Sequence, residues 1–562
     1  MPSIRNAPTL LVLMSALSFI AWGQGGRGRG AQTQQQGTPT QQAAPPAATP
    51  APQAGRGGRG GAPGPATSEF YNYDPNAGSA PAISDSQPTE THQKVTINGQ
   101  AVNYTARAGY LPLRNATTGQ SEAHLFYTAY SKDGGDSAVR PVCFFLGGGP
   151  GVAASWQEFG GLGPKRMKWA ADGGPGMPPY GWAENPNTLL AQADLVFVNP
   201  VGTAYSRPDQ PGRGPSFWTS ASDVASLGEF VRSYLNAYNL RNSPLFLAGE
   251  DAGTGRAAGL AAYLIEHQIP VQGVALLSMS LSPDAMAGDA QYINLLPSLT
   301  MAAWRHKKLA QDLNAMSAEQ IAGQARQFAA REYLHALYKG DRMTAEERTK
   351  VIADLSRFTG LSKAFIVNNN LRITLDRFNT ELLHDQHKGL STTDARVTGF
   401  LPTAGAGGRG GGGGGGFFGA PPVVIDFNLS SLAGGFQAAY EGYLKRELSF
   451  GGNNTGIYYL TGGGIGTFTS AGNDDASLAG AFARNPNLRL YVAMNYYDLG
   501  APFYATEFTL AHLNVSPEVR AHNITISHFE SGQMPYVDNH ALAKLQSDLA
   551  GFVKQATSSE RN

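Results

Sequence analysis

The sequence predicts an α/β fold, in which helices cover a largely parallel β-sheet. Short, solidly apolar runs recur along the chain, and such runs are typical of central strands that are buried on both faces. They stand at residues 142–146, 195–198, 245–248, 274–277, 488–493 and 524–527. Before them, residues 95–130 alternate apolar and polar side chains between turn signals at Asn98-Gly99 and Asp133-Gly134. This alternation predicts antiparallel strands at one edge of the sheet.

A helical insertion is predicted within this α/β core. Between Asp284 and Arg396 apolar residues recur at helical spacing with charged residues between them, as in 318–337 and 345–358. A glycine-rich stretch at 404–422 follows, and its composition is typical of a surface loop. The expected organisation is therefore a core made of residues 92–284 and 423–562, with a helical cap at 285–422.

The amino terminus has the pattern of an export signal. Arg5 is followed by an apolar run and then by Ala21-Trp22-Gly23, which has the small-x-small form of a cleavage site. The run is shorter than the ~20 residues that cross a bilayer, so cleavage at 1–23 is favoured over retention as an anchor. Residues 24–91 are rich in Gly, Arg, Gln, Pro and Ala and predict a disordered leader. We expect an exported protein, periplasmic or extracellular, without stable membrane association after cleavage.

Composition excludes several classes of partner and cofactor. Lys+Arg and Asp+Glu both number 42, so the chain has no charge surplus to hold a nucleic acid or an anionic membrane. Cys143 is the only cysteine, which excludes an internal disulfide, a CxxC redox pair and a cysteine-based zinc site. Because the sequence also has no HExxH motif or comparable histidine cluster, we expect no metal and no cofactor. The expected partner is a peptide or small-molecule ligand.

The segment after the third apolar run has the form of a nucleophile elbow. Residues 244–248 predict a strand, Gly249-Glu250-Asp251-Ala252-Gly253 a tight turn, and the following residues a helix. Glycines on both sides permit a strained turn that raises the middle side chain at the start of the helix. There the next backbone N–H and the helix dipole stabilise developing negative charge. The middle residue is Asp251, whereas this pattern usually has serine.

Several motifs in order give the chain its resemblance to a known family. They are Gly147-Gly-Gly149-Pro-Gly151, Asn185-Pro-Asn, Asp194 to Arg207, the elbow, Asn495-Tyr-Tyr-Asp498 and Glu530-Ser-Gly-Gln533-Met534. Together they resemble the bacterial secreted branch of the serine carboxypeptidases, from about His92 to the carboxyl end. The resemblance implies an α/β-hydrolase fold and a Ser-Asp-His triad. It also implies release of single residues from peptide carboxyl termini, without metal or cofactor.

The chain departs from this family at the triad positions. Carried over by the resemblance, the serine position is Asp251, the acid is retained as Asp498, and the histidine position is Gln533. Acyl transfer needs a base that relieves the nucleophile of its proton, and a glutamine amide has no useful basicity. We therefore predict impaired or absent peptidase activity, in a protein retained for binding or as a scaffold.

The substrate positions that the resemblance implies are changed as well. The asparagine that holds the substrate carboxylate is replaced by Gly147, and the tyrosine after the serine by Ala252, while the carboxylate-binding Glu250 is kept. Backbone N–H groups of Gly149 and Ala252 remain as the expected oxyanion donors. Because Asp251 stands beside Glu250, we expect peptides with free carboxylates to bind poorly.

Two enzyme alternatives stay open on the sequence. An elbow aspartate attacks alkyl halides or epoxides in other α/β-hydrolases, so Asp251 is a candidate nucleophile for a non-peptide electrophile or ester. A peptidase with a displaced base is the other alternative, with His528 or His540 as that base; it predicts a close contact between a histidine and Asp498. Ser278 and Ser280 also follow a strand but lack flanking glycines, and we interpret them as turn residues.

Overall fold

The structure is a computed structural model that describes residues 87–135, 139–148, 151–170, 173–279, 281–401, 426–451 and 474–558. The predicted signal at 1–23, the leader as far as residue 86 and the glycine-rich loop at 404–422 lie outside the described residues, as do Gly149 and Ser280. The first described strand begins at Thr89, so the last three residues of the stretch expected as leader belong to the sheet.

Ten strands of the described residues form one sheet, and this confirms the predicted α/β class. In spatial order they are β1 (Thr89–Ile97), β2 (Gln100–Arg114), β3 (Ser121–Lys132), β7 (Asp194–Val198), β4 (Val142–Leu146), β9 (Leu245–Glu250), β10 (Gly273–Leu277), β13 (Arg489–Asn495) and β14 (Ile524–Phe529), with β8 (Arg207–Pro208) on β3. The pairs from β7 to β14 are parallel, and β1 to β3 are antiparallel, as the two sequence patterns predict.

Both faces of the sheet are buried, which explains why its central strands are solidly apolar. Alternate residues of β4 enter different cores: Phe144 packs with α2 (Ser220–Ala237) and α3 (Gly253–Glu266), whereas Phe145 packs with α11 (Phe427–Arg446) and α15 (Asn539–Thr557). Side chains of a strand alternate between faces, so a strand that is covered on both sides needs apolar residues at every position.

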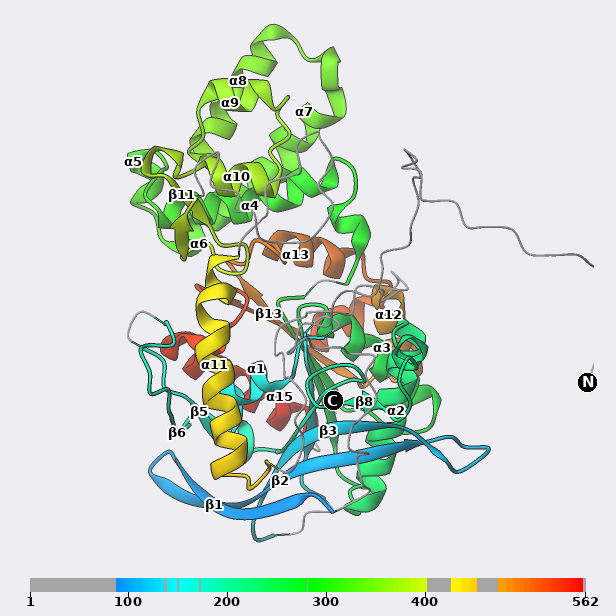
Figure 1. Ribbon diagram of the computed structural model, residues 1–562. Coiled ribbons are helices and arrows are strands. Elements are labelled where there is room, and N and C mark those ends of the chain that lie inside the picture. Colours follow the sequence, from blue (N-terminus) through cyan, green and yellow to red (C-terminus); the bar gives the residue numbers. More distant parts are fainter. Residues whose placement is uncertain are drawn as a thin grey trace, which may run out of the picture. The chain divides into compact units, whose positions relative to one another are not determined.

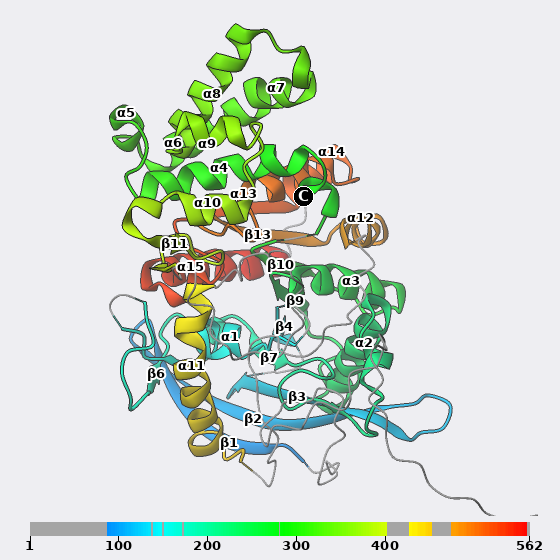
Figure 2. The same cartoon turned by 45° about the horizontal axis from the view of Figure 1, so that its top comes forward.

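The helices are placed on the two faces accordingly, as Figures 1 and 2 show. In Figure 2, α2 and α3 stand to one side of the central strands, with α11 and α15 to the other. The remaining helices of the core are α1 (Ser155–Gln157), α12 (Asp474–Arg484), α13 (Phe503–His512) and α14 (Pro517–His522). In the part of the chain that is described, no helix combines the length and the apolar content that a membrane span requires.

Most of the described residues between β10 and α11 are helical. It contains α4 (Ala290–Arg305), α5 (Gln311–Asn314), α6 (Ala318–Phe328), α7 (Leu334–Lys339), α8 (Ala345–Thr359), α9 (Lys363–Asn368) and α10 (Leu375–Glu381). Capping boxes at Ser317 and Thr344 start α6 and α8, because their hydroxyls accept N–H groups that have no partner within the helix. A small hairpin of β11 (Lys388–Leu390) and β12 (Thr398–Phe400) follows, which the helical pattern did not predict. Helix α4 packs on α13 and so joins this segment to the core.

Candidate functional site

The predicted elbow is present between β9 and α3. Asp251 lies between the end of the strand and the start of the helix with φ of 52°, a left-handed conformation that non-glycine residues rarely adopt. Its backbone N–H donates to the carbonyl of Leu277 on β10 (3.0 Å), and its carbonyl accepts from the N–H of Thr254 (2.9 Å). The strained turn is therefore held from both sides, as a nucleophile elbow requires.

Close backbone packing explains the glycines of the elbow. A Cβ on Gly249 would overlap the carbonyl of Gly253, and a Cβ on Gly253 would overlap the carbonyl of Gly147. Backbone atoms thus approach more closely than side chains allow at three places: the end of β9, the start of α3, and the loop at Gly147 and Gly148 after β4, called the glycine loop below. Since both approaches involve backbone atoms, no rotamer change would relieve an added methyl group.

Gly147, the position of the family's asparagine, has no room for a side chain in this structure. A Cβ built there would overlap the carbonyl oxygen of Val152 and crowd the backbone of Ala153 and Ala154. The carboxylate-binding amide that the resemblance implies is thus missing from the sequence. The surrounding backbone also leaves no space for such a side chain at position 147.

Arg256, in the second turn of α3, ties the elbow to the glycine loop. Its Nε donates to the carboxylate of Asp223 on α2 (2.6 Å), and its Nη1 donates to the carbonyls of Gly147 (2.9 Å) and Gly148 (2.8 Å). The Arg256 and Asp223 side chains are about 95% buried. Burial raises the pKa of Asp223 more than the charge of Arg256 lowers it. One buried cation therefore fixes the relative position of α2, α3 and the loop after β4.

Glu250 is buried directly beneath the elbow. Both of its carboxylate oxygens accept from the hydroxyl of Tyr536, at 2.9 and 2.8 Å. Burial raises the pKa of Glu250 to about 8, the Tyr536 hydrogen bond lowers it, and the charges of Asp251 and Asp498 raise it further. At neutral pH this carboxyl group is therefore mostly protonated.

Asp498 follows β13 and lies within electrostatic range of Asp251. Its Oδ1 accepts from the backbone N–H groups of Gly500 (2.9 Å) and Ala501 (3.0 Å), whereas its Oδ2 has no hydrogen-bond partner. Burial raises the pKa of Asp498 to about 7; the Ala501 N–H lowers it and the charge of Asp251 raises it. Burial also raises the pKa of Asp251. Asp251 and Asp498, which the resemblance assigns to one triad, are thus close enough for the charge of one to shift the pKa of the other.

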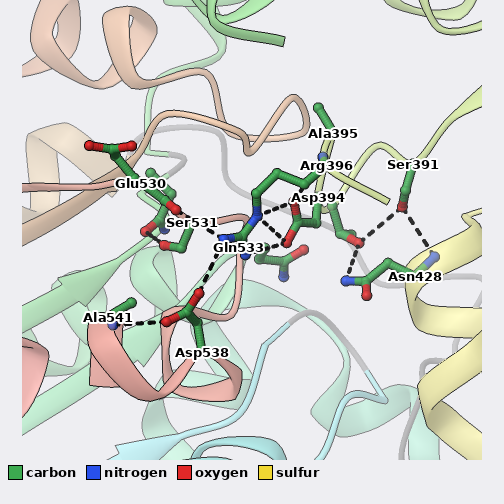
Figure 3. A network of polar contacts seen from close by, with 12 residues as sticks. Ser391, Asp394, Ala395, Arg396, Asn428, Glu530, Ser531, Gln533, Asp538 and Ala541 are labelled. Carbon is green, nitrogen blue, oxygen red and sulfur yellow. Dashed lines mark hydrogen bonds and ion pairs between the residues drawn. The ribbon is translucent and has the colours of Figure 1, made fainter. Parts of the chain in front are cut away.

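Gln533 lies on a loop that is fastened at both ends. Its backbone N–H donates to the carbonyl of Thr393 (2.7 Å). Nearby, Arg396 pairs with Asp394 (2.7 Å) and Asp538 (3.3 Å) and donates to the carbonyl of Glu530 (3.0 Å). Figure 3 shows the side chain of Gln533 beside this network, with no dashed contact drawn to it. These contacts fix the loop that carries Gln533, the residue that the resemblance assigns to the position of the base.

No described histidine takes over the role of the missing base. His528 lies on β14, and its Nε2 is 3.0 Å from Glu507 and 3.1 Å from Arg326. His540 is exposed in the first turn of α15. Within the described ranges no histidine is hydrogen-bonded to Asp498. The contact expected for a peptidase with a displaced base is therefore not observed, because His528 is already bound to Glu507.

Ser278 belongs to the site, although the sequence suggested a simple turn residue. It follows β10 with φ of 52° and is buried. Its Oγ donates to the carbonyl of Gln533 (2.9 Å) and accepts from Nδ2 of Asn495 (2.7 Å), and its hydroxyl lies close enough to Asp498 to lower the pKa of that group. The only sequence signal is its place after an apolar run. Strand order, which the sequence does not state, brings it beside the elbow.

The model of the serine carboxypeptidase family matches residues 96–372, a range that includes the elbow but ends before Asp498 and Gln533. No curated protein matches.

One similar solved structure is a lipase in its open form, with 12% sequence identity and a TM-score of 0.31; the match covers 80% of this chain and 99% of the lipase. Another is esterase E22, also with 12% identity and a TM-score of 0.31, over 81% of this chain and 100% of the esterase. A soluble variant of monoglyceride lipase from Saccharomyces cerevisiae in complex with a substrate analog has 9% identity over 80% of this chain and 95% of its own, with a TM-score of 0.33. TM-scores of this size carry no information about activity. On the family match, residues 96–372 of this chain belong to the serine carboxypeptidase family.

Proposed function

We propose that this protein is a serine carboxypeptidase-like hydrolase-fold protein with little or no peptidase activity, which binds a peptide or small-molecule ligand. The observation that carries the proposal is the elbow itself: its backbone is arranged for a nucleophile, yet it presents Asp251. Of the triad only Asp498 is kept, and one of its oxygens has no partner. Without a base that accepts a proton, a hydroxyl or water nucleophile is not activated.

The binding side of the cleft supports the same proposal. Recognition of a peptide carboxylate needs donors, and the asparagine that would supply one is replaced by Gly147, where a side chain does not fit. What stands at the elbow instead is Asp251, beside Glu250 in sequence and close enough to Asp498 to raise its pKa. An ionised Asp251 would repel a substrate carboxylate strongly in such a poorly solvated place, whereas Glu250, mostly protonated at neutral pH, adds little charge.

We expect the purified protein to leave blocked dipeptides with free carboxylates intact. The measurement is product release from a panel of such dipeptides and of simple esters, with an active serine carboxypeptidase as the reference. Even a serine protease without its triad keeps a ~10³ to 10⁴-fold acceleration over water, so a trace of activity would be consistent with the proposal. Turnover comparable with that of the reference would contradict it.

A second candidate is hydrolysis of a non-peptide electrophile by Asp251. The observation in its favour is that Asp251 is partly exposed at an intact elbow and that the N–H of Ala252 hydrogen-bonds to its side chain. Attack by a carboxylate oxygen on an alkyl or epoxide carbon would form an ester as the halide leaves or the ring opens, and attack on an ester carbonyl would form an anhydride and release the alcohol; water must then cleave either intermediate. An ester or epoxide activity that disappears in Asp251→Ala would establish this candidate, whereas an activity unchanged by the substitution would exclude it.

Export is part of the proposed function. The signal-like residues 1–23 support it. The direct test is to express the full chain and to determine whether the protein is secreted and has lost residues 1–23.

A further inference from the structure

The loop of the small hairpin contacts both segments that carry triad-equivalent residues. This hairpin loop consists of residues 391–397, between β11 and β12. The acid loop is defined as 496–502, which connects β13 to α13 and carries Asp498. The base loop is defined as 530–538, which connects β14 to α15 and carries Gln533. Because the hairpin loop is distant in sequence from the other two, its contacts with them depend on the fold.

Backbone hydrogen bonds fasten the acid loop to the hairpin loop on both sides of Asp498. The N–H of Leu499 donates to the carbonyl of Thr392 (3.0 Å). The N–H of Ala395 donates to the carbonyl of Tyr497 (2.9 Å). Both chain neighbours of Asp498 are thus bonded to the hairpin loop, so a displacement of that loop would displace the carboxyl group as well.

The base loop packs directly on the hairpin loop. The N–H of Gln533 donates to the carbonyl of Thr393 (2.7 Å). A Cβ on Gly532 would lie 2.4 Å from the Cβ of Asp394 and 2.5 Å from the carbonyl oxygen of Thr393. Only glycine permits so close an approach of the two backbones. The hairpin loop therefore sets the position of Gln533 as well as that of Asp498.

Arg396 of the hairpin loop contacts all three loops through one guanidinium group. Its Nε and Nη2 donate to the carboxylate of Asp394 in its own loop, at 3.0 and 2.7 Å. In the base loop, its Nη1 donates to the carbonyl of Glu530 (3.0 Å) and to the carboxylate of Asp538 (3.3 Å), as Figure 3 shows. The guanidinium also lies over the ring of Tyr497 in the acid loop, 5.7 Å from the ring centroid. A planar fork of several donors can make these contacts at the same time.

Two helices hold the hairpin loop in addition. Asp426, at the start of α11, accepts from the hydroxyl of Ser391 (2.7 Å) and from the N–H of Thr393 (2.9 Å). His306, at the end of α4, donates from Nε2 to the carbonyl of Ala395 (2.7 Å). The hairpin loop thus connects a helix of the inserted segment to the candidate site.

We propose that the hairpin, acid and base loops form one cooperative unit, in which Arg396 is the positioning residue for Asp498 and Gln533. Segments that share hydrogen bonds open and close together, and such units open more readily than the whole fold. A movement of the inserted helices that displaced the hairpin loop would then shift both triad-equivalent positions at once. The inference goes beyond the proposed function, because it concerns how the site is held and not what it hydrolyses.

Hydrogen exchange of single amides in the purified full chain tests this unit. The reporter amides are those of Leu499, Ala395 and Gln533, which make the hydrogen bonds between the loops. Mass spectrometry with fragmentation to single residues gives their rates. We expect Arg396→Met to accelerate exchange of all three at least ~10-fold and by similar factors, because the unit loses charge-assisted hydrogen bonds. The amide of Asp251, which is bonded to β10, is the internal reference and should change by less than ~2-fold.

Arg140→Met is the matched control. Arg140 also pairs with a carboxylate, that of Asp194 (2.6 Å), and donates to the carbonyl of Ala191 (3.4 Å), both in another part of the core. Its side chain is 17% exposed, compared with 22% for Arg396. This variant should leave the rates of the three reporter amides unchanged within ~2-fold. A control that accelerates them as much as Arg396→Met does would overturn the inference.

The pattern of rates decides between positioning and a merely structural role. Acceleration at Gln533 without Leu499 would show that Arg396 fixes the base loop alone, and it would overturn the proposed unit. Equal acceleration at Asp251 would show a general loss of stability and would overturn it as well. Unchanged rates at all three reporter amides would contradict the role of Arg396.

Arg396→Lys keeps the test decisive even where the methionine variant does not fold. Lysine retains the charge but not the fork of donors, so it restores part of the contacts. We expect the three reporter amides to exchange faster than in the unaltered protein by one common factor, smaller than that of Arg396→Met. A factor that differs between Leu499 and Gln533 would contradict cooperativity. Hydrolysis of peptides by the unaltered protein would refute the proposed function and leave this inference untouched.

Discussion

The free energy of unfolding of this protein is expected to fall as the pH rises from about 5 to about 8. Burial raises the pKa of Glu250 to about 8, of Asp498 to about 7 and of Glu158 to about 7, from their ordinary values of 4.5, 3.8 and 4.5. Between the two pKa values of such a group the folded state holds a proton that the unfolded state has lost. Each group then lowers the free energy of unfolding by about 1.4 kcal/mol per pH unit.

Urea denaturation at a series of pH values measures this effect. The stabilising contribution is complete below the unfolded pKa values and is lost as the pH passes through the folded values near 7 and 8. The urea midpoint should therefore move to lower concentration across this window at constant m-value. Asp498→Asn should flatten the curve, because an amide cannot ionise. A midpoint that rises steadily from pH 5 to pH 8 would contradict the burial of these carboxyl groups.

Arg256→Met is expected to destabilise the fold by about 3 to 5 kcal/mol, because it leaves Asp223 as an unpaired buried charge. The ion pair joins Nε of Arg256 to Oδ2 of Asp223 at 2.6 Å, with both side chains buried. The same change removes the N–H group that donates hydrogen bonds to the carbonyl oxygens of Gly147 and Gly148. Urea denaturation gives the loss directly.

A second substitution separates the ion pair from the loop contacts. Arg256→Met combined with Asp223→Leu removes both charges, so the double variant should regain most of the loss, since apolar pairs of similar volume often replace buried ion pairs. The residual deficit, about 1 to 3 kcal/mol, would report the two carbonyls left without a donor. Arg232→Met is the exposed control: this arginine pairs with Glu229 on the surface of α2 and should change stability by less than about 1 kcal/mol. A loss from Arg256→Met no larger than that of the control would exclude the structural role of Arg256.

The central strands and the elbow could be predicted from sequence because both are local patterns. The run at 142–146 coincides with β4, since a strand covered on both faces requires apolar residues throughout. The elbow was predictable because its glycines mark a backbone approach that few other sequences permit. The hairpin of β11 and β12 was missed, because three-residue strands carry too little periodicity to stand out from helical sequence.

The composition of the site depends on contacts that no local pattern describes. Ser278 reaches Asp498 and Gln533 only because β10 lies between β9 and β13 in the sheet. The pair of Arg256 and Asp223 joins residues 33 positions apart on two helices. The lack of space at Gly147 follows from the path of the backbone at Val152. Each of these requires tertiary packing, whereas the identities of Asp251, Asp498 and Gln533 could be assigned by resemblance.

The measurement that tests the central claim most directly is peptide hydrolysis by the double variant Asp251→Ser with Gln533→His, beside the unaltered protein. The substitution Gly147→Asn is left out because a side chain there would overlap Val152. We expect the unaltered protein to release no measurable product from blocked dipeptides. The double variant should release product, because Asp498 and the elbow backbone remain in place. An unaltered protein that hydrolyses these dipeptides as fast as an ordinary serine carboxypeptidase would contradict it.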